Sequence, residues 1–516
     1  MGPILETISE ATAPAALWFG STLFSDLARR LRIGVKELTE EKGIYSPAFD
    51  EEDLSGLAGG IGKYHDRIIF KTEMSEDDLK TKLDELITWE KDRTLDMFGT
   101  LLYNNREVEE NAFRAYMHQY LQIHYVILPE ASVQGNIIMA ISPYLDALEL
   151  MGSFPPDNAN NPIAKMMSKP AEDKSASHYI RGSELFRQID SDHNQFVKKN
   201  PDKSRTIRDI NDIAFGVDDA GETKAEFKYQ EYFAVVYADA DGMGSFLKSI
   251  STEEVSDFSK CCLDYSKEAA NLIGQFDGMT IYAGGDDLLF LAPVKKGTET
   301  IFDLCGKISG KFKESLEKEK RFKDKPIPTV SFGISIQYKK YPLYEALDQA
   351  RGQLFGIAKH YEGKNCMAIR LEKHSGQSLS IIVGNECAEV FSTILSMPEK
   401  YNGEAFLKSI GNSLEEHYAL VSLMDTNVKN ATGEEPVYSK WDNLFDNGGQ
   451  KAAQAFLTEL NKVYYEQVVR GQARISEANV DRPLWIKREN KSLNALLAIL
   501  RMMKFFTEKS GGKEDH

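Results

Sequence analysis

Apolar positions change their spacing several times along this chain of 516 residues, and each change predicts a different element. The sharpest run is "EYFAVVYADADGMGSF", which is apolar from Phe233 to Ala238 and then reaches two aspartates, Asp239 and Asp241. A short, continuous apolar run of this kind is typical of a buried strand. The segment at 254–276, "EVSDFSKCCLDYSKEAANLIGQF", has apolar residues at helical spacing, so it predicts an amphipathic helix.

A hairpin is predicted next. "MTIYA" and "LLFLAPV" are apolar strands, and Gly284-Gly285-Asp286-Asp287 separates them. Glycine reaches positive φ without a steric penalty and leaves room for a ligand near the backbone. The pattern after the hairpin then predicts a helix, a strand, a helix and a strand at 298–320, 329–337, 343–361 and 365–372. The order βαββαβ, with a further helix and strand, is typical of a ferredoxin-like or palm arrangement.

The two ends of the chain have weaker patterns. The N-terminal part predicts alternating helices and strands at 11–31, 67–72, 75–98, 121–128 and 141–151. Such alternation predicts a sheet with helices packed on it. The C-terminal part is mostly helical in pattern, as at 451–471 and 492–506.

We therefore predict an α/β (α+β) protein with two ferredoxin-like palm domains and a helical C-terminal domain. The predicted parts are a first, noncatalytic palm-like domain at 1–165, a linker or small insert at 166–225, a catalytic palm at 226–375 and the helical domain at 376–516.

Composition narrows the function classes. The net charge of −17 opposes nonspecific binding of nucleic acid by the whole surface, so any RNA contact would be local or made through partner chains. The five cysteines form no CxxC pair, which argues against structural zinc. The sequence has no apolar run of membrane-spanning length and no signal core, so we expect a soluble, cytoplasmic protein without a membrane partner.

The aspartates are the candidate chemistry. In a palm, the first strand and the hairpin are neighbours about 4.8 Å apart, so Asp239 would face Asp286 and Asp287. Carboxylates about 4 Å apart repel by roughly 4 kcal/mol at an effective dielectric of about 20, and a divalent metal offsets such repulsion. Mg²⁺ prefers a few carboxylates together with water and substrate phosphates. The trio thus predicts a site for two Mg²⁺ or Mn²⁺ ions that would activate a 3′-hydroxyl and hold the triphosphate of ATP.

Other residues near these motifs are candidates for binding the nucleotide. The backbone N–H groups of Gly242, Met243 and Gly244 precede a helix and would cradle phosphate oxygens, and Asp241 is placed with them. Lys359 and Lys364 follow the last helix and would neutralise the triphosphate. Solvated lysines at a helix end are the competing interpretation of both.

Each motif alone has an ordinary structural explanation. GGDD is common turn sequence, and an aspartate at the end of a strand is usually a cap. The ordered combination favours catalysis, because a strand with DxD, a helix, the GGDD hairpin, "SFGISI" and "AKHYEGKN" follow one another at plausible spacing.

These motifs resemble the palm of nucleotide cyclases related to GGDEF diguanylate cyclases. More closely, they resemble the large polymerase/cyclase subunit of type III CRISPR effector complexes, of the Cmr-type (III-B) branch. "ADADGMGSF" and "YAGGDDLLF" match its catalytic palm, and "PLYEALDQARGQLFGIAKHYEGKNCMAI" matches the segment that closes it. The opening "GPILETISEATAPAALWFGSTLFSDLARRL" is similar to the start of its first palm, so the resemblance spans most of residues 1–375.

The resemblance implies roles for individual residues and for the whole chain. Asp239, Asp286 and Asp287 would ligate metal, the backbone carbonyl of Ala240 would assist, and Gly284 and Gly285 would let the nucleotide approach. In this family, target RNA bound to the assembled complex switches on synthesis of a second messenger from ATP. The implied partners are other Cmr-type subunits, the guide crRNA and the target RNA.

The product is left open between two possibilities. The usual product is cyclic oligoadenylate, made by 3′–5′ adenylyl transfer, whereas one branch without an HD nuclease joins AMP to S-adenosylmethionine. This chain begins directly at the first palm, and its one HD dipeptide, His65-Asp66, lacks the other motifs of an HD nuclease, so we do not expect DNA cleavage. Asp66 and Glu149 are candidate partners for the amine and sulfonium of S-adenosylmethionine, and simple surface carboxylates are an equally good interpretation.

The chain also departs from the family pattern in its cysteines, which supply no zinc site between the palms, and in a missing or shortened strand before "GPILE". Two alternative functions follow from the same residues. One is a noncatalytic scaffold subunit, against which the intact trio of aspartates argues. The other is a stand-alone diguanylate-type cyclase, against which Asp287-Leu288 argues, because those enzymes have Glu-Phe there.

Overall fold

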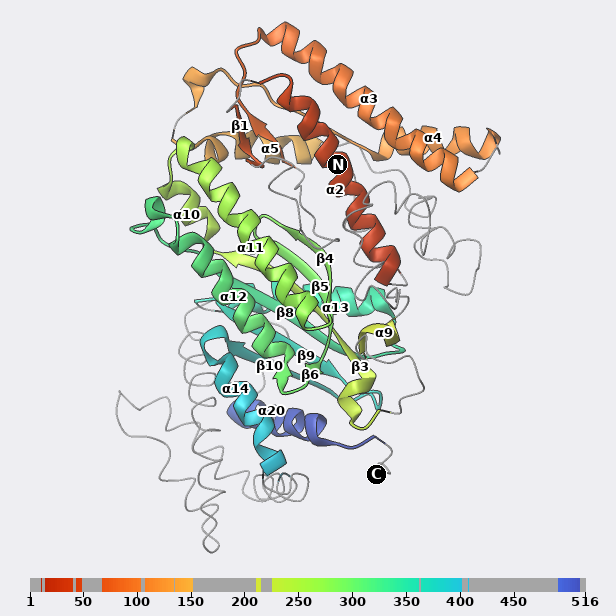
Figure 1. Cartoon of the computed structure of the whole chain (residues 1–516), viewed down its shortest axis with the longest axis vertical. Coiled ribbons are helices and arrows are strands. Elements are labelled where there is room, and N and C mark those ends of the chain that lie inside the picture. Colours follow the sequence, from red (N-terminus) through yellow and green to blue (C-terminus); the bar gives the residue numbers. More distant parts are fainter. Residues whose placement is uncertain are drawn as a thin grey trace, which may run out of the picture.

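The computed structural model describes residues 11, 14–39, 43–48, 67–103, 107–133, 135–151, 210–214, 225–361, 363–400, 407 and 491–510. The predicted insert at 166–225 lies largely outside these residues, and the predicted helix at 451–471 and Asp66 lie wholly outside them. The described chain is a mixed α/β structure around one large sheet, as predicted (Figure 1).

The central sheet has six strands in the order β10-β9-β8-β3-β5-β4. Neighbouring strands are antiparallel except for β8 and β9, which are parallel. The strands are β3 (Tyr232–Asp241), β4 (Met279–Gly284), β5 (Asp287–Pro293), β8 (Thr329–Tyr338), β9 (Cys366–Glu372) and β10 (Ser378–Gly384). The predicted βαββαβ order is confirmed, with α11 (Val255–Gln275), α12 (Ile301–Glu317) and α13 (Leu343–Gly356) as the connecting helices.

Both faces of the sheet are covered, which explains why β3 is apolar along nearly its whole length. Ala234 and Val236 point into a core built with α11 and α12, whereas Phe233 and Val235 point into a second core built with α13 and α2 (Pro14–Lys36). Helix α13 packs directly on β8 at Gly333, where a Cβ would lie 2.2 Å from the carbonyl oxygen of Ala350. Only glycine fits at this close approach.

The described N-terminal block is mainly helical. It contains α2, α3 (Glu76–Tyr103), α4 (Glu107–Tyr120) and α5 (Ile137–Met151), together with a two-stranded sheet of β1 (Ile44–Ser46) and β2 (Ile69–Phe70). The helices predicted at 11–31, 75–98 and 141–151 and the strand predicted at 67–72 are confirmed, with shifted ends. The assignment of this block as a first palm stays a prediction.

The strand predicted at 121–128 is wrong, since this described segment is irregular. Its apolar residues pack against helices and do not pair in a sheet. Tyr125 and Ile127 pack against a small core formed by Val35, Leu79 and Leu83 on α2 and α3. Burial therefore accounts for the apolar pattern there without strand pairing.

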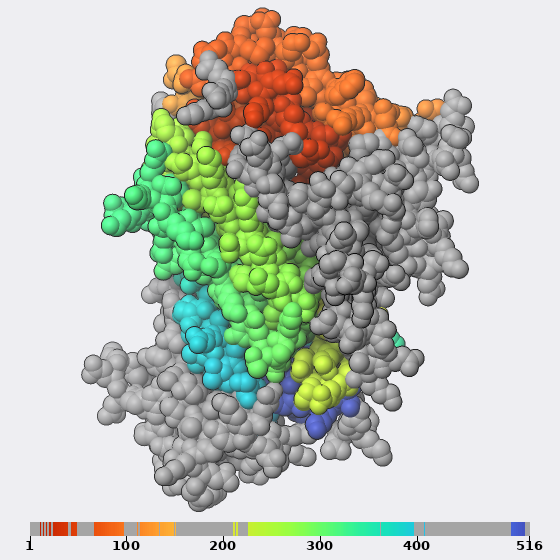
Figure 2. All heavy atoms as spheres, viewed as in Figure 1, coloured from red at the N-terminus to blue at the C-terminus, as the bar shows by residue number. Residues whose placement is uncertain are grey.

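The N-terminal block is joined to the sheet domain by buried and partly buried hydrogen bonds. The side-chain amide of Asn136 donates hydrogen bonds of 3.1 Å to the carbonyl oxygens of both Leu247 and Ile250. The backbone N–H of Ala48 donates to the hydroxyl of Ser259. Figure 2 shows the red and orange N-terminal elements seated on the end of the green ones.

The C-terminal part adds a strand and two helices to the sheet domain. β10 pairs with β9, so the sheet continues past residue 375. Helices α14 (Ala388–Lys400) and α20 (Lys491–Thr507) contribute to the same core as α11 and α12, and the helix predicted at 492–506 is confirmed. The four-part division of the chain stays a prediction. Of the helices that the structure describes, none is both long and apolar enough to span a bilayer.

Candidate nucleotide and metal site

The three candidate aspartates lie at neighbouring strand ends. β3 and β5 are adjacent and antiparallel, with Ala238 paired to Leu288, so Asp239 comes next to the start of β5 at Asp287. The turn between β4 and β5 has Gly285 at φ 66°, while Asp286 does not adopt positive φ. Glycine at the first of the two central positions is the requirement of a type II′ hairpin turn. The predicted neighbourhood of Asp239 and the GGDD turn is confirmed.

These carboxylates repel one another. Desolvation by the surrounding protein and then repulsion from Asp239 raise the pKa of Asp286 to about 6. Desolvation, then Asp286 and Asp239, raise the pKa of Asp287 well above its usual value. Asp287 is exposed to solvent and Asp286 is half-buried. Repulsion among like charges therefore adds to desolvation in raising the pKa of both residues.

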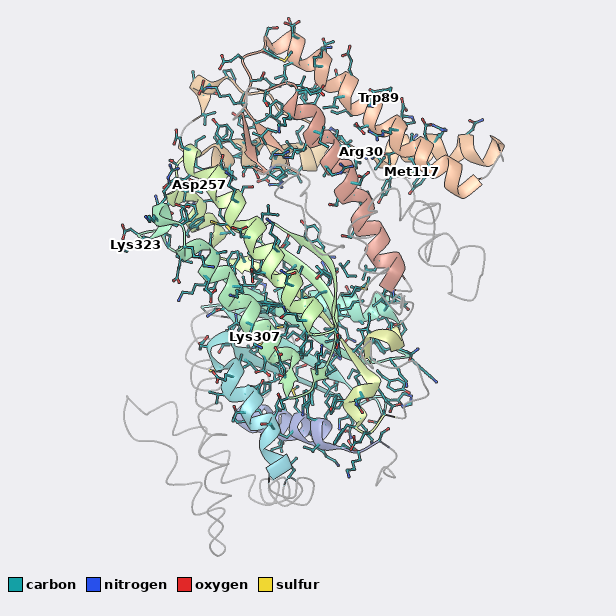
Figure 3. The ribbon with its side chains drawn as sticks, viewed as in Figure 1. Arg30, Trp89, Met117, Asp257, Lys307 and Lys323 are labelled. Carbon is teal, nitrogen blue, oxygen red and sulfur yellow. The ribbon has the colours of Figure 1, made fainter. Side chains whose placement is uncertain are left out.

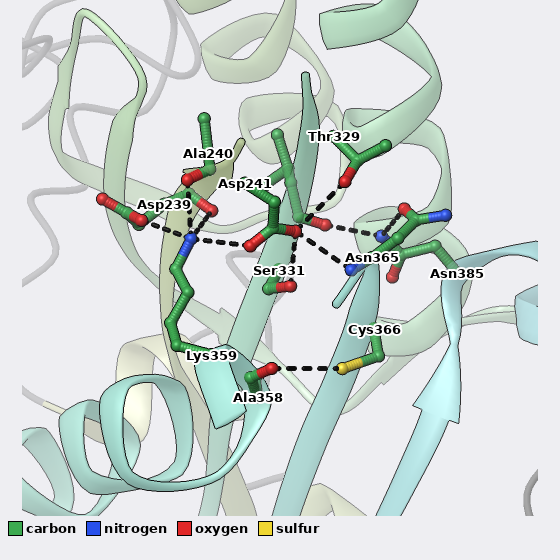
Figure 4. A network of polar contacts seen from close by, with 11 residues as sticks. Asp239, Ala240, Asp241, Thr329, Ser331, Ala358, Lys359, Asn365, Cys366 and Asn385 are labelled. Atoms are coloured by element: carbon green, nitrogen blue, oxygen red, sulfur yellow. Dashed lines mark hydrogen bonds and ion pairs between the residues drawn. The ribbon is translucent and has the colours of Figure 1, made fainter. Parts of the chain in front are cut away.

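One cation, the ammonium group of Lys359, is held at this strand end (Figure 4). Its Nζ donates to the carbonyl oxygens of Asp239 and Ala240, both at 2.7 Å, and to Oδ1 of Asp241 at 2.8 Å. It is also in direct contact with the side-chain carboxylate of Asp239. The Lys359 side chain is 13% exposed, so this position is shielded but reachable.

Asp241 is more deeply buried than Lys359 and is held by side chains of β8. Its Oδ2 accepts hydrogen bonds from the hydroxyls of Thr329 and Ser331 and from the backbone N–H of Asn365. Its side chain is 5% exposed. The structure thus joins Asp241 to Lys359 and to the loop before β9, directly before the predicted phosphate cradle with which the sequence grouped it.

The predicted phosphate cradle begins directly after Asp241. Gly242, with φ 76°, is the N-cap of α10 (Met243–Ser249), which also contains Met243 and Gly244. A Cβ at Gly242 or Gly244 would meet no atom within 4 Å, so the backbone here borders open space. A ligand has room to approach this turn, as the sequence predicts.

The remaining predicted residues are placed differently. Lys364 is exposed and adopts positive φ in the loop before β9, and its side chain has no hydrogen bond or ion pair with any residue that the structure describes. Gly284 ends β4 and pairs with Asp287. Glu149 is in α5, and its side chain, like Asp66, lies outside the described part of the chain.

Sequence reasoning missed a set of polar residues that supports the site. The amide of Asn385 donates to the side chains of Ser309 and Asn365 and to the carbonyl oxygen of Val330. Ser331 and Asn365 lie within the quoted segments "SFGISI" and "AKHYEGKN", but nothing in their spacing reveals that they meet at Asp241. Tyr265, which is 1% exposed, has a hydroxyl without a hydrogen-bond partner among the described residues.

Two observations bear on the predicted metal site. Within the described ranges, no group of three or more His, Cys, Asp or Glu side chains is arranged to hold a metal ion. Nevertheless, oxygen atoms of Asp239 and Ala240 already converge on one cation, the Lys359 ammonium. Hard oxygen donors, including carboxylates whose negative charge exceeds the nearby positive charge, are suitable ligands for Mg²⁺ or Mn²⁺. The residues present therefore suit the predicted ions.

Residues 232–368 match the family model for the second palm domain of Cas10/Cmr2. This segment is therefore similar to the Cas10/Cmr2 second palm. The match runs from the start of β3 to Ala368 in the first half of β9, and hence includes Asp239, the GGDD turn and Lys359. The predicted relationship to the large subunit of type III CRISPR complexes is confirmed for this part of the chain.

The chain is also similar to individual proteins and solved structures. The CRISPR system Cmr subunit Cmr2 of Pyrococcus furiosus is 30% identical over 187 residues, which cover 31% of this chain and 21% of that protein. The chain thus spans about a fifth of the length of this curated relative. A type III-B Cmr-beta complex in the apo state contains a chain of similar fold, with a TM-score of 0.51 and 11% identity over 97% of this chain and 81% of that one. A Csm1-Csm4 cassette in complex with cA4 gives a TM-score of 0.48 and 13% identity over 97% and 68% of the two chains.

Proposed function

We propose that this chain is the signalling subunit of a type III, Cmr-type CRISPR effector complex, and that it makes a nucleotide second messenger from ATP. The observation that carries the proposal is the pairing of β3 with β5 in a Cas10/Cmr2 palm, which brings Asp239 to the Asp286–Asp287 turn. Three carboxylates at one strand end, with raised pKa values at two of them, are a costly arrangement for a purely structural role.

Each group at the strand end has a proposed role. Asp239, Asp286 and Asp287 hold two Mg²⁺ or Mn²⁺ ions, which when bound would favour attack of a 3′-hydroxyl on the α-phosphorus and departure of pyrophosphate. The carbonyl oxygen of Ala240 assists them. Gly284 and Gly285 keep the turn clear of side chains, so that the nucleotide approaches the backbone.

The triphosphate is proposed to lie against the start of α10. A Cβ at Gly242 or Gly244 would meet no atom within 4 Å, and the N–H groups of Gly242, Met243 and Gly244 would donate to phosphate oxygens there. Lys359, from the loop after α13, supplies positive charge next to the carboxylates, and Lys364 would add charge from the edge.

Partners are part of the proposal. The curated relative is a Cmr subunit, and a chain with net charge −17 is poorly suited to bind RNA over its whole surface. We therefore expect guide crRNA and target RNA to reach this chain through other Cmr-type subunits, with target RNA switching synthesis on. No cleavage of DNA by this chain is proposed.

The product remains the open part of the proposal, either cyclic oligoadenylate or AMP joined to S-adenosylmethionine. The test is to assemble the full chain with its partner subunits and guide RNA, and to supply labelled ATP with Mg²⁺ or Mn²⁺. Four arms, with and without target RNA and with and without S-adenosylmethionine, are then resolved by mass. Product that requires target RNA supports the proposal, and its mass decides between the two messengers.

The same experiment has contrary outcomes. A complex that assembles and binds target RNA but forms no product in any arm would make the chain a scaffold subunit. Product formed from GTP by the chain alone would instead indicate a diguanylate-type cyclase.

A further inference from the structure

We propose that Lys359 is an internal counter-cation that occupies the metal position, and that a divalent ion displaces its ammonium group from Asp239 and Ala240 when it binds. The inference rests on the proposed function and assigns to Lys359 a step before any nucleotide chemistry. Lys359 would then be a positioning residue that competes with the metal and afterwards meets the triphosphate.

The geometry points to shared ligands. Three of the four oxygen atoms that contact Nζ belong to Asp239 and Ala240, namely two backbone carbonyl oxygens at 2.7 Å and one carboxylate oxygen. The same carboxylate and the Ala240 carbonyl are the groups proposed to hold the metal. Two cations cannot both be ligated by the Asp239 carboxylate and the Ala240 carbonyl oxygen at these distances, because their repulsion in a shielded site is large.

The fourth contact explains how the lysine stays nearby. Oδ1 of Asp241 lies 2.8 Å from Nζ on the inner side, and the other oxygen of Asp241 is fixed by Ser331, Thr329 and the N–H of Asn365. Figure 4 shows Nζ between Asp239 and Ala240 on one side and Asp241 on the other. Asp241 therefore keeps the Lys359 ammonium group near the site while the Asp239 carboxylate exchanges it for the metal ion.

The exchange would couple metal binding to nucleotide binding. Without a nucleotide, an entering ion must replace a cation that is already well bound, which lowers its apparent affinity. With a triphosphate present, the released ammonium gains new anionic partners, so metal and nucleotide each favour the other. Lys359 thus keeps the carboxylates partly neutralised until both ligands are present.

The first experiment compares binding of Mn²⁺ alone to the full chain, measured by electron paramagnetic resonance, in the native protein and in Lys359→Met. We expect Lys359→Met to bind Mn²⁺ roughly tenfold more tightly or better, the factor for losing one charge-assisted competitor. Lys364→Met removes the same charge from an exposed lysine farther along the same connection between α13 and β9, and it should change the affinity much less. Equal gains in the two variants would mean a general charge effect and would overturn the exchange.

The second experiment follows Lys359 itself. Brief acylation of amines, read out by peptide mass spectrometry, should modify Lys359 slowly in the metal-free chain, since its side chain is 13% exposed, and faster at saturating Mn²⁺. Lys364 is exposed and serves as the internal control whose rate should not change. An Asp286→Asn/Asp287→Asn variant should lose the acceleration.

The outcomes separate the two proposals. If Mn²⁺ binds and Lys359 stays protected, the exchange is wrong while the metal site stands. If the native chain and Lys359→Met both fail to bind Mn²⁺ at millimolar concentration, the metal site fails, and the exchange fails with it.

Discussion

Two clusters of charged side chains in this protein are built in opposite ways. In the N-terminal block, Arg30 of α2 forms ion pairs with Asp26 at 3.1 Å and with Glu90 of α3 at 3.3 Å, and all three side chains are less than a tenth exposed. Figure 3 labels Arg30 on α2, close to α3. In the palm, Asp239, Asp286 and Asp287 share one nearby cation, Lys359.

The difference is the one expected between a structural cluster and the proposed functional site. The Arg30 cluster is compact and paired, and Thr94 accepts a further hydrogen bond of 2.7 Å from the guanidinium, so its charges serve the contact between two helices. The palm cluster has an excess of negative charge, and the pKa of Asp286 is raised to about 6. An excess that the fold leaves in place indicates a site for a cation from solution.

Removing the palm carboxylates gives the largest expected effect. Asp286→Ala with Asp287→Ala should lower messenger formation by roughly a thousandfold or more, because several kcal/mol of charge stabilisation is lost at the reacting phosphate. The melting temperature should stay the same or rise, since repulsion with Asp239 is removed. Product formation in the reconstituted complex and a thermal melt of the chain measure the two effects. Undiminished product would show that the site has been assigned to the wrong residues.

Removing the N-terminal cation should give the reverse pattern. Arg30→Met leaves the buried carboxylates of Asp26 and Glu90 without their main partner, so the free energy of unfolding should fall by about 3–5 kcal/mol. Messenger formation per folded molecule should not change. The control is Arg29→Met, whose side chain is 36% exposed and pairs with the same Asp26, and it should cost less than about 1 kcal/mol in urea unfolding. If Arg30→Met and Arg29→Met lowered the free energy of unfolding equally, the Arg30 cluster would not be the structural cluster described above.

The same contrast explains what the sequence could predict. The palm was predictable because β3, the GGDD turn and the segment around Lys359 carry local signals, namely an apolar run, turn glycines and carboxylates in fixed order. The position of Lys359 between Asp239 and Asp241 was not, because it depends on how α13 packs on the sheet at Gly333. In the N-terminal block, Tyr125 and Ile127 have a strand-like pattern, but their burial comes from α2 and α3.

A smaller change tests whether the open space at α10 belongs to the palm site. Gly244→Ala adds one methyl group where no atom lies within 4 Å, so folding should be unaffected or stabilised by up to about 1 kcal/mol. If phosphates approach this backbone, the affinity for a nonhydrolysable ATP analogue should fall by roughly tenfold, about 1.4 kcal/mol. Calorimetric titration measures the affinity. Gly274→Ala, near the end of α11 and also in open space, is the matched control and should bind the analogue normally.

The raised pKa values predict how stability depends on pH. Asp286 has its pKa raised from the usual 3.8 to about 6, so between these values the folded state binds more protons than the unfolded state. The free energy of unfolding should therefore fall as the pH rises from about 4 to about 6. In an Asp286→Asn/Asp287→Asn variant, the free energy of unfolding, measured with urea, should fall less over this pH range. Parallel curves for the two proteins would mean that the carboxylates are not electrostatically strained.

The smallest expected effect concerns a tyrosine beside the palm cluster. Tyr265 on α11 is buried, packs edge-on against Phe312 at 4.9 Å and interacts electrostatically with Asp286, yet its hydroxyl has no partner among the described residues. Tyr265→Phe keeps the ring contact and removes an unsatisfied polar atom, so the chain should be unchanged or more stable by up to about 1 kcal/mol.

Tyr232→Phe is the matched control, because the Tyr232 hydroxyl accepts a hydrogen bond of 3.0 Å from the backbone N–H of His374. That variant should lose about 1 kcal/mol or more in urea unfolding. If Tyr265→Phe lost as much unfolding free energy as Tyr232→Phe, the Tyr265 hydroxyl near Asp286 would have a structural hydrogen-bond partner. The palm cluster would then resemble the paired Arg30 cluster more than its excess of negative charge indicates.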